Sequence, residues 1–413
     1  MTCTPRERAL LRDLAQRVKE CAASPVMAAR RRQWVEHNSL RSKRPMMLVF
    51  PEGAWFDLMP DGTLTCESKD ARLTEWHLRA RLYQHEHFAD DTVLEPTWTV
   101  GAVVRDTGWG LNPQRHDAPE ARGAWGFDPV LKERADLKKL RYPELIFDEQ
   151  ATNANRAAMH DLFGDILTIV PKGCAHISFH LTNRYIQYRG LTEMMLDMAD
   201  EPEFAHELLA FFAEGERRRV QALIDLNLLS LNNDDTYQNS GGNGYTDQLP
   251  APGFNPQRVR PADMWASAEA QELAQVSPEM HAEFPLRYEK ELLAPFGLTG
   301  YGCCEDLTRK LPDVFAIPHI RRISISPFAD VEACAAQLKG NYIFSWKAHP
   351  AHLVGVFDGV AVRAYIEHAV LAAKANGCVL EMILKDTHTC EQHPERFDEW
   401  TRIAREVIES NAS

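Results

Sequence analysis

The pair Cys303 and Cys304 stands directly before a carboxylate, Glu305, in the run GYGCCEDL. A second group of metal-binding side chains lies in the run LKDTHTCEQH, which contains His388 and Cys390. Zinc binds thiolate, imidazole and carboxylate groups, and a catalytic zinc ion keeps one position open for its substrate. These five residues are candidate zinc ligands, with Cys304, His388 and Cys390 preferred and Cys303 or Glu305 as substitutes. The alternative is that the thiols are reduced and buried and that His388 is hydrogen-bonded in a loop.

The run NNDDTYQNSGGNGYTDQLP is a long polar segment rich in glycine. Its glycines let the backbone approach a substrate closely, and Asp235, Tyr237 and Tyr245 can form hydrogen bonds or act as a general acid. A flexible surface loop is the alternative. Lys385, which directly precedes the second metal-binding group, can orient a substrate. We therefore predict catalytic roles for Asp235, Tyr245 and Lys385, and a substrate-binding role for Tyr237.

Regular elements must hold these residues in place, and short apolar runs alternate with helical patterns along most of the chain. The apolar runs predict strands at 46–50, 165–170, 228–233, 298–303, 320–327, 341–346 and 379–384. Amphipathic patterns predict helices up to about residue 38 and at 71–88, 191–227, 277–297, 305–314, 328–340, 359–377 and 394–410. The range 191–227 is predicted to be a pair of helices joined at Glu201-Pro202. Such alternation indicates βαβ units and a parallel sheet.

The sequence has neither a G-x-G-x-x-G run after its first strand nor a P-loop motif, which argues against a nucleotide-binding doubly wound fold. We therefore predict an α/β fold of the TIM (β/α)8 barrel type with N-terminal helical and loop additions. Residues 1–45 are expected to form a helical extension. Residues 46–413 are expected to form a single barrel with a long insertion at about 92–150, where helix signals are weak.

In such a barrel the catalytic groups lie where strands end and the following loops begin. This rule selects Glu52 and Trp55 after the first strand, and Trp346 and Lys347 at the end of a later one. We assign these four residues to substrate binding. The rule also places the cysteine pair at the same edge of the sheet. A thiolate there would meet the N-terminus of the helix predicted at 305–314, which would lower its pKa.

The chain has 413 residues and a formal net charge of −13. This charge argues against nucleic-acid and anionic-membrane partners, because phosphates need lysine and arginine. No apolar run is long enough for a membrane span, and the N-terminal helix lacks the apolar region of a signal peptide. The scattered cysteines do not suggest a disulfide framework. We therefore expect a cytoplasmic protein that acts on a small molecule.

Several stretches resemble the uroporphyrinogen decarboxylase superfamily, which also contains methyltransferases that use corrinoid proteins. GLTEMMLDMADEPEFAHELLAFFAEG is similar to the family's helix pair, and GYGCCEDLTRKLPDV occupies the place of its H-x-C-G segment. ISISPFADVEACAAQLKGNYIFSWKAHPAHLV and GCVLEMILKDTHTCEQHPERFDEWTRIARE resemble its later strands and helices. The resemblance covers about residues 160–410 and implies a TIM barrel and a homodimer. The decarboxylase's arginine-rich motif for porphyrinogen carboxylates is not found in the sequence.

In the methyltransferases, zinc is held by a histidine and a cysteine two residues apart and by a later cysteine. The resemblance places Cys304 on the first cysteine and Cys390 near the later one. Gly302 stands where the histidine is expected, and Cys303 is its substitute. The resemblance thus implies a zinc-dependent transfer of a methyl group between a small thiol, methyl ether or amine and a cobalamin.

The cobalamin would be carried by a separate corrinoid protein, because the sequence has no D-x-H-x-x-G segment for binding cobalt. Two alternatives stay open. One is a metal-free lyase of the decarboxylase type that acts on a small carboxylated substrate. The other is a non-catalytic barrel that serves as a binding subunit.

Overall fold

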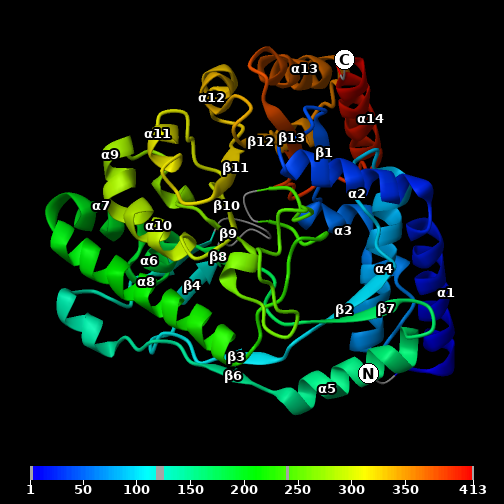
Figure 1. Cartoon of the computed structure of the whole chain (residues 1–413), viewed down its shortest axis with the longest axis horizontal. Coiled ribbons are helices and arrows are strands. Elements are labelled where there is room, and N and C mark those ends of the chain that lie inside the picture. Colours follow the sequence, from blue (N-terminus) through cyan, green and yellow to red (C-terminus); the bar gives the residue numbers. More distant parts are fainter. Residues whose placement is uncertain (1–2, 118–124, 239–240, 412–413) are drawn as a thin grey trace.

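The computed structural model describes residues 3–117, 125–238 and 241–411. Its centre is a parallel sheet of seven strands in the order β1-β13-β12-β11-β10-β9-β8 (Figure 1). The strands are β1 Met46–Val49, β8 Ser178–Phe179, β9 Trp265–Ala268, β10 Leu298–Tyr301, β11 Ile320–Ile325, β12 Ile343–Ala348 and β13 Val379–Leu384. The α/β fold with a parallel sheet that the sequence predicts is therefore confirmed. In the described part of the chain, β1 and β8 are the outer strands of this order.

Helices form a layer on one face of the sheet (Figure 1). They are α9 Pro278–His281, α10 Arg287–Leu293, α11 Leu311–Val314, α12 Val331–Leu338, α13 Gly359–Ala375 and α14 Glu395–Ser410. Trp346 of β12 and Met382 of β13 share a buried core with these helices. α14 illustrates the packing, because its apolar positions recur at helical spacing and are buried. These positions are Phe397, Trp400, Ile403, Ala404, Val407 and Ile408.

The opposite face of the sheet carries polar side chains at the alternate strand positions, because successive side chains of a strand point to opposite faces. Arg322, Ser345, Lys347 and Glu381 come from three neighbouring strands, and none exposes more than 2% of its surface. Buried charges are costly unless they are paired. This face therefore needs partners from elsewhere in the chain.

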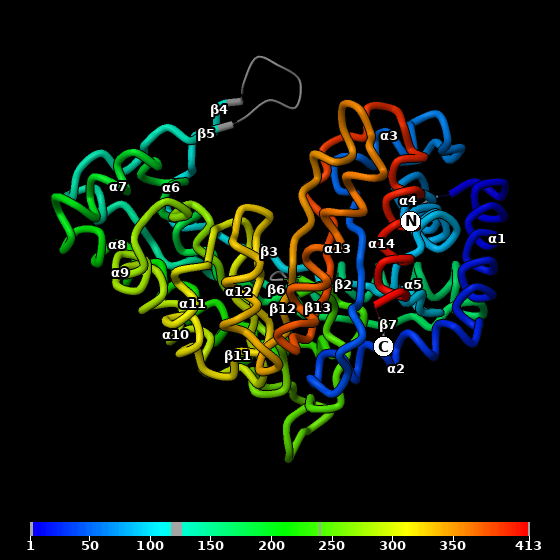
Figure 2. Tube along the Cα trace, turned by 90° about the horizontal axis from the view of Figure 1, so that it is seen from above, coloured from blue at the N-terminus to red at the C-terminus, as the bar shows by residue number. Residues whose placement is uncertain are grey.

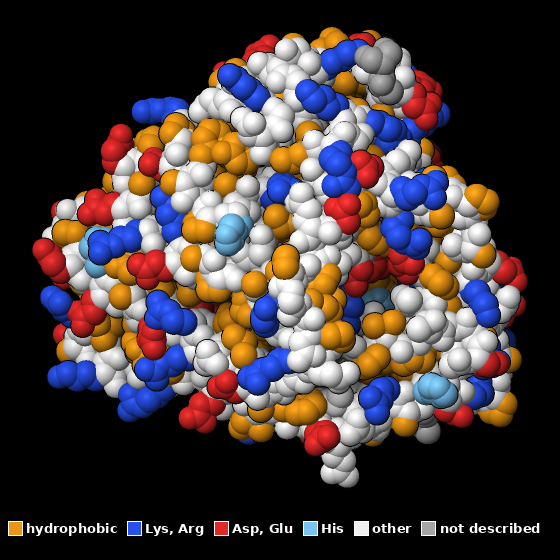
Figure 3. Space-filling view, viewed as in Figure 1, with side chains coloured by type: hydrophobic (Ala, Val, Ile, Leu, Met, Phe, Trp, Pro, Cys, Tyr) orange, Lys and Arg blue, Asp and Glu red, His pale blue; other side chains and the backbone are white. Residues whose placement is uncertain are grey.

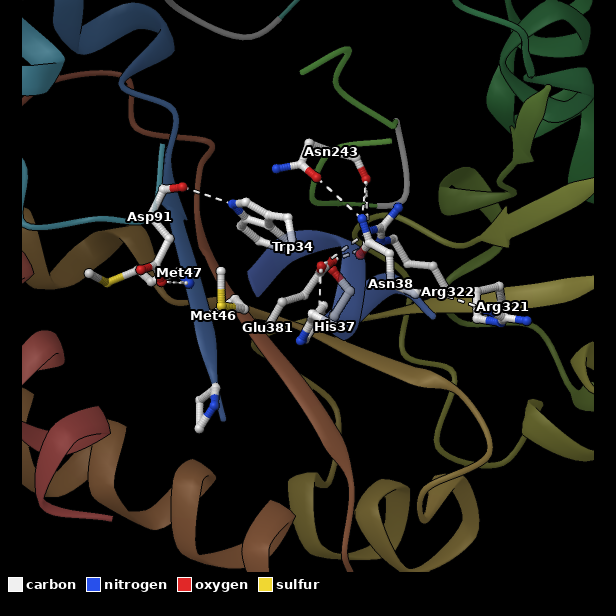
Figure 4. Close-up of polar contacts among 12 residues, drawn as sticks. Trp34, His37, Asn38, Met46, Met47, Asp91, Asn243, Arg321, Arg322 and Glu381 are labelled. Carbon is white, nitrogen blue, oxygen red and sulfur yellow. Dashed lines mark hydrogen bonds and ion pairs between the residues drawn. The ribbon is translucent and has the colours of Figure 1, made fainter. Parts of the chain in front are cut away.

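The N-terminal helices supply some of these partners. α1 (Pro5–Ala22) and α2 (Pro25–Asn38) form where the sequence predicts them, and α1 packs on α4 (Lys69–His87). α2 ends against the polar face of the sheet, where the side-chain oxygen of Asn38 accepts a hydrogen bond from Arg322 at 2.8 Å (Figure 4). The N-terminal extension is therefore part of the central packing.

The segment predicted as an insertion contains short paired strands. β2 (Thr97–Gly101) pairs in parallel with β7 (Thr168–Lys172), the strand that follows the segment. The antiparallel pairs are β3 Val104–Asp106 with β6 Leu145–Phe147, and β4 Gln114–Asp117 with β5 Trp125–Asp128. The β4–β5 pair projects from the body of the molecule (Figure 2). The insertion thus combines peripheral strands with one strand that supports β7.

The helix pair predicted around Glu201-Pro202 is confirmed as α7 (Leu191–Asp200) and α8 (Pro202–Asp225). Pro202 occupies the first position of α8, where its missing N–H costs no helical hydrogen bond. Two further helices, α5 (Glu149–Phe163) and α6 (Leu181–Arg189), lie where no helix was expected from the sequence. A short helix, α3 (Trp55–Leu58), follows β1.

The prediction of a helix at 305–314 is wrong over most of this range, because only its last four residues, α11 (Leu311–Val314), are helical. Asp306 explains the difference. Its Oδ1 accepts both the backbone N–H and the hydroxyl of Thr308, at 2.8 Å and 2.5 Å. Such local side-chain bonds compete with helix formation. The residues after the cysteine pair therefore form turns.

The strand predicted at 228–233 is reduced to one parallel bridge between Leu229 and Cys174. A side chain takes over part of the strand's role. The Asn232 amide donates to the Trp265 carbonyl at 2.9 Å, and its oxygen accepts the Trp265 backbone N–H at 2.9 Å. The amide thus imitates the backbone of a neighbouring strand.

No helix in the described part of the chain is both long and apolar enough to cross a membrane. The face of the molecule in Figure 3 mixes acidic and basic side chains, with apolar ones between them. Although the net charge is −13, this face also carries many lysine and arginine side chains.

Candidate functional site

A lysine and two carboxylates meet where β1 and β13 end. The Lys385 ammonium lies 3.6 Å from Asp386 Oδ1 and 3.9 Å from Glu52 Oε1. The backbone N–H of Asp386 donates to Glu52 Oε2 at 2.9 Å, which ties the two loops together. Burial by itself would lower the pKa of Lys385, but Tyr237 and the surrounding acidic groups raise it above its ordinary value. Lys385 is therefore a fixed positive charge at neutral pH.

The cysteine pair follows β10 and lies beside this cluster. Cys303 Sγ is 3.6 Å from Cys304 Sγ, and Cys304 Sγ is 3.7 Å from Asp386 Oδ2. Contact with Cys304 and burial raise the pKa of the Cys303 thiol well above its ordinary value. The prediction that a helix N-terminus lowers a thiol pKa here is wrong, because the next helix begins only at Leu311.

The other predicted zinc ligands lie in different surroundings. Glu305 is fully buried, and its two oxygens accept the backbone N–H groups of Ala270 and Cys303. Cys390 is also fully buried and belongs to the core under the helices, whereas His388 is exposed. Among the described residues, no three His, Cys, Asp or Glu side chains converge closely enough to hold a metal ion. The predicted five-ligand set therefore does not converge.

A buried ion pair lies on the polar face of the sheet (Figure 4). Arg322 Nε is 2.9 Å from Glu381 Oε1, and its Nη2 is 3.2 Å from Oε2. His37 Nε2 lies 3.5 Å from the same carboxylate. Burial alone would raise the pKa of Glu381, but Arg322 and His37 hold it at about 2. The carboxylate is therefore ionised throughout the neutral range.

Lys347 lies on the same face, nearer to the carboxyl ends of the strands. Its Nζ donates to Ser345 Oγ at 3.0 Å. A Cβ added to Gly241 would lie 2.6 Å from this Nζ, so the polar segment packs directly on the lysine. Burial and the positive charge of Lys385 lower the pKa of Lys347 to about 8. Lys347 can therefore exchange a proton closer to neutral pH than an ordinary lysine.

A pocket of about 250 Å³ lies between β1, α4 and the polar segment. Three predicted site residues line it, namely Asp235, Tyr237 and Tyr245. The Tyr237 ring is tilted against the Phe50 ring, with centroids 4.7 Å apart. Tyr245 donates its hydroxyl to Glu95 at 2.6 Å. Burial raises the pKa of Tyr237, nearby acidic groups raise it further, and the positive charge of Lys385 opposes them. Tyr237 therefore borders the pocket and also interacts with the charged groups where β1 and β13 end.

Two predicted substrate-binding residues lie apart from this cluster. Trp346 has no exposed surface, and its ring centroid lies 5.1 Å from that of Tyr365 in α13. It points away from Lys347, because neighbouring strand residues face opposite sides of the sheet. Trp55 contacts Trp76 and Tyr83 of α4, with ring centroids 5.7 Å apart in both pairs. Packing accounts for both tryptophans.

Neither the protein-family models nor the curated proteins contain a match to this sequence.

Sequence reasoning missed His180 and Glu269, which follow β8 and β9 at the same edge of the sheet. His180 Nδ1 contacts Glu269 Oε1. Glu269 is 3% exposed, and its Oε2 has no hydrogen-bond partner among the described residues. Burial and the Glu269 charge raise the pKa of Glu305. The signal that could have found the pair is the short run WASAE, in which a carboxylate ends an apolar stretch.

Glu269→Gln is expected to lower the pKa of His180. Burial alone would lower this pKa, but the contact with Glu269 raises it above the ordinary value of 6.5. The imidazolium therefore stabilises the fold fully below that value, and the contribution is lost as the pH rises through the raised pKa. An NMR titration of the imidazole measures the change. Glu272→Gln is the matched control and should shift the pKa less, so equal shifts would contradict the assignment.

Proposed function

We propose that the chain is a zinc-dependent methyltransferase of the corrinoid type, with its site where β1, β10 and β13 end. The observation that carries the proposal is the distance of 3.6 Å between the Cys303 and Cys304 sulphurs. Two sulphurs on one tetrahedral zinc ion, each at about 2.3 Å, lie about 3.8 Å apart. The pair thus has the spacing of two ligands of one ion. The sequence resemblance also assigns Cys304 to a zinc-ligand position.

Asp386 is the third donor of the proposed site. Its Oδ2 lies 3.7 Å from the Cys304 sulphur, and a sulphur and an oxygen on one zinc ion lie about 3.5 Å apart. The proposed ligands are therefore Cys303, Cys304 and Asp386, in place of His388 and Cys390. Because no three such side chains of the described residues converge closely enough to hold an ion, these three would have to close on the zinc as it binds. Three protein ligands leave the fourth position for a substrate.

Bound zinc would supply a Lewis acid that stabilises a substrate thiolate or polarises a C–O bond. The chain's own residues have separate tasks in the proposal. Lys385 attracts a negative group of the substrate, and Tyr237 keeps its proton and donates a hydrogen bond. Lys347 takes up or releases a proton near neutral pH. We propose that the cobalamin belongs to a partner protein and that the parallel sheet forms part of a TIM barrel, as the resemblance implies.

Metal analysis of protein purified without chelator tests the proposal. We expect about one zinc ion per chain, as for a three-ligand catalytic site. Cys304→Ala should lose the metal, whereas Cys174→Ala, which changes another partly exposed cysteine, should keep it. Wild-type protein without zinc, or full zinc content in Cys304→Ala, would contradict the proposal.

A metal-free lyase acting on a small carboxylated substrate is the second candidate. The observation that favours it is the placement of Lys347 in β12 and of Lys385 directly after the neighbouring strand β13, at one edge of the sheet. Ammonium groups bind carboxylates through charge-assisted hydrogen bonds. Release of carbon dioxide that persists in chelator and is lost in Lys385→Met would favour the lyase. Loss of all activity in chelator would favour methyl transfer.

A further inference from the structure

The pocket between β1, α4 and the polar segment contains a carboxylate with unused acceptors. Asp235 lines the pocket and is exposed, and no side chain or backbone group of the described residues donates a hydrogen bond to it. Its neighbour Asp234 is engaged, because it lies 2.5 Å from Lys172 Nζ and accepts from Thr236. Asp235 is thus the pocket's free acidic group.

The same pocket contains a guanidinium with an unused donor. Arg81 binds the carbonyl oxygens of Thr97 and Glu95 through Nη1 and Nη2, which fixes the side chain in place. Its Nε donates to none of the described residues. Burial lowers the pKa of Arg81, and the carboxylates of Asp235 and Glu95 oppose this effect. Arg81 and Asp235 therefore act on one another across the pocket without an ion-pair contact.

Two other polar side chains of the wall, Gln84 and Tyr245, are bonded to groups outside the pocket. Gln84 donates to the Val49 carbonyl at 3.0 Å, and the Tyr245 hydroxyl is bonded to Glu95. The rest of the lining includes apolar side chains, among them Leu48, Phe50, Val93 and Leu94. A volume of about 250 Å³ admits only a small molecule. The pocket thus offers one positive group, one negative group and an apolar surface.

We propose that this pocket binds a small zwitterion of the amino-acid class, with its ammonium group on Asp235 and its carboxylate on Arg81. The aliphatic part then lies against Leu48 and Val93. A ligand with a single charge leaves one of the two protein groups without a partner, whereas a zwitterion pairs both. The idea that this ligand is a methyl-transfer substrate rests on the proposed function. The binding of the ligand does not, because neither zinc nor cobalamin takes part in the contacts with Asp235 and Arg81.

Isothermal titration calorimetry of the full chain with norvaline, pentanoate and butylamine tests the inference. The three molecules share an aliphatic body, but pentanoate lacks the ammonium group and butylamine lacks the carboxylate. We expect norvaline to bind at least about tenfold more tightly than either, since each loses one charge-assisted hydrogen bond. Equal affinities, or no norvaline binding at millimolar concentration, would overturn the inference.

Asp235→Asn should reduce the affinity for norvaline to that for pentanoate and leave pentanoate binding unchanged. Asp225→Asn is the matched control, because Asp225 lies at the end of α8 and its side chain accepts, within the described part of the chain, only from Gln221. An unchanged norvaline affinity in Asp235→Asn would also overturn the inference. If the protein binds norvaline but contains no zinc, the proposed function is wrong and this inference stands. If it contains zinc but does not bind norvaline, this inference is wrong and the proposed function stands.

Discussion

Replacing Arg322 by methionine is expected to lower the free energy of unfolding by about 3–5 kcal/mol, the cost of leaving one charge of a buried pair without its partner. Neither Arg322 nor Glu381 has exposed surface. The guanidinium also lies over the Trp265 ring, 5.0 Å from its centroid. Methionine fills similar space but leaves the Glu381 carboxylate beside the His37 imidazole, whose pKa is lowered by burial and which is therefore uncharged at neutral pH. Urea unfolding followed by circular dichroism measures the difference.

Arg321→Met is the matched control for this variant. Arg321 is partly exposed and donates to the Asn38 carbonyl and to Gln248, so its loss should cost only about 1–2 kcal/mol. The double variant Arg322→Met/Glu381→Met removes both buried charges and should recover much of the stability. A double variant as unstable as Arg322→Met would show that packing, and not charge, holds this layer.

The same pair sets the response to acid. The pKa of Glu381 is held at about 2, below the ordinary value of 4.5. Its carboxylate therefore contributes stability that is fully present above pH 4.5 and is lost as the pH falls through about 2. Arg322→Met removes the main cause of the lowered pKa. Acid unfolding of that variant should consequently begin at a higher pH than in the wild type.

The strands of the later half were predictable because their apolar runs are buried on both faces. The run VLEMIL even marks the polar interior, since Glu381 interrupts an otherwise apolar stretch. Its partners could not be predicted in the same way. Arg322 comes from β11, with β12 between the two strands, and Asn38 comes from a helix near the start of the chain. Such pairings depend on which faces meet in the folded sheet.

The rule that catalytic groups lie where strands end placed Glu52 and the cysteine pair at one edge of the sheet, because it requires only that parallel strands end together. It does not predict the path after each strand. Asp386 has a φ of 58° and Glu391 a φ of 56°, so the segment after β13 turns sharply. These turns carry Cys390 into the core under the helices, where its N–H donates to an aspartate. Spacing in the sequence therefore could not select the ligands.

Gly242→Ala is expected to destabilise the chain by about 2–5 kcal/mol, the sum of a left-handed backbone and a steric overlap. Gly242 has a φ of 60°, and a Cβ there would lie 2.4 Å from Glu381 Oε2 and 2.6 Å from Arg322 Nη2. Both atoms belong to the buried ion pair, so neither can move away at low cost. The polar segment would have to lift from the sheet, which would displace Asp235 and Tyr237 from the pocket.

Gly253→Ala separates the two causes. Gly253 has a φ of 76°, but its Cβ would meet no atom within 4 Å, so this variant carries only the backbone cost of about 1–2 kcal/mol. The excess loss in Gly242→Ala then measures the contact between the polar segment and the ion pair. Norvaline binding should weaken in Gly242→Ala and persist in Gly253→Ala. If Gly242→Ala and Gly253→Ala lost equal stability, the polar segment would accommodate the Cβ added at position 242 without a steric cost. The ion pair would then not position Asp235 and Tyr237.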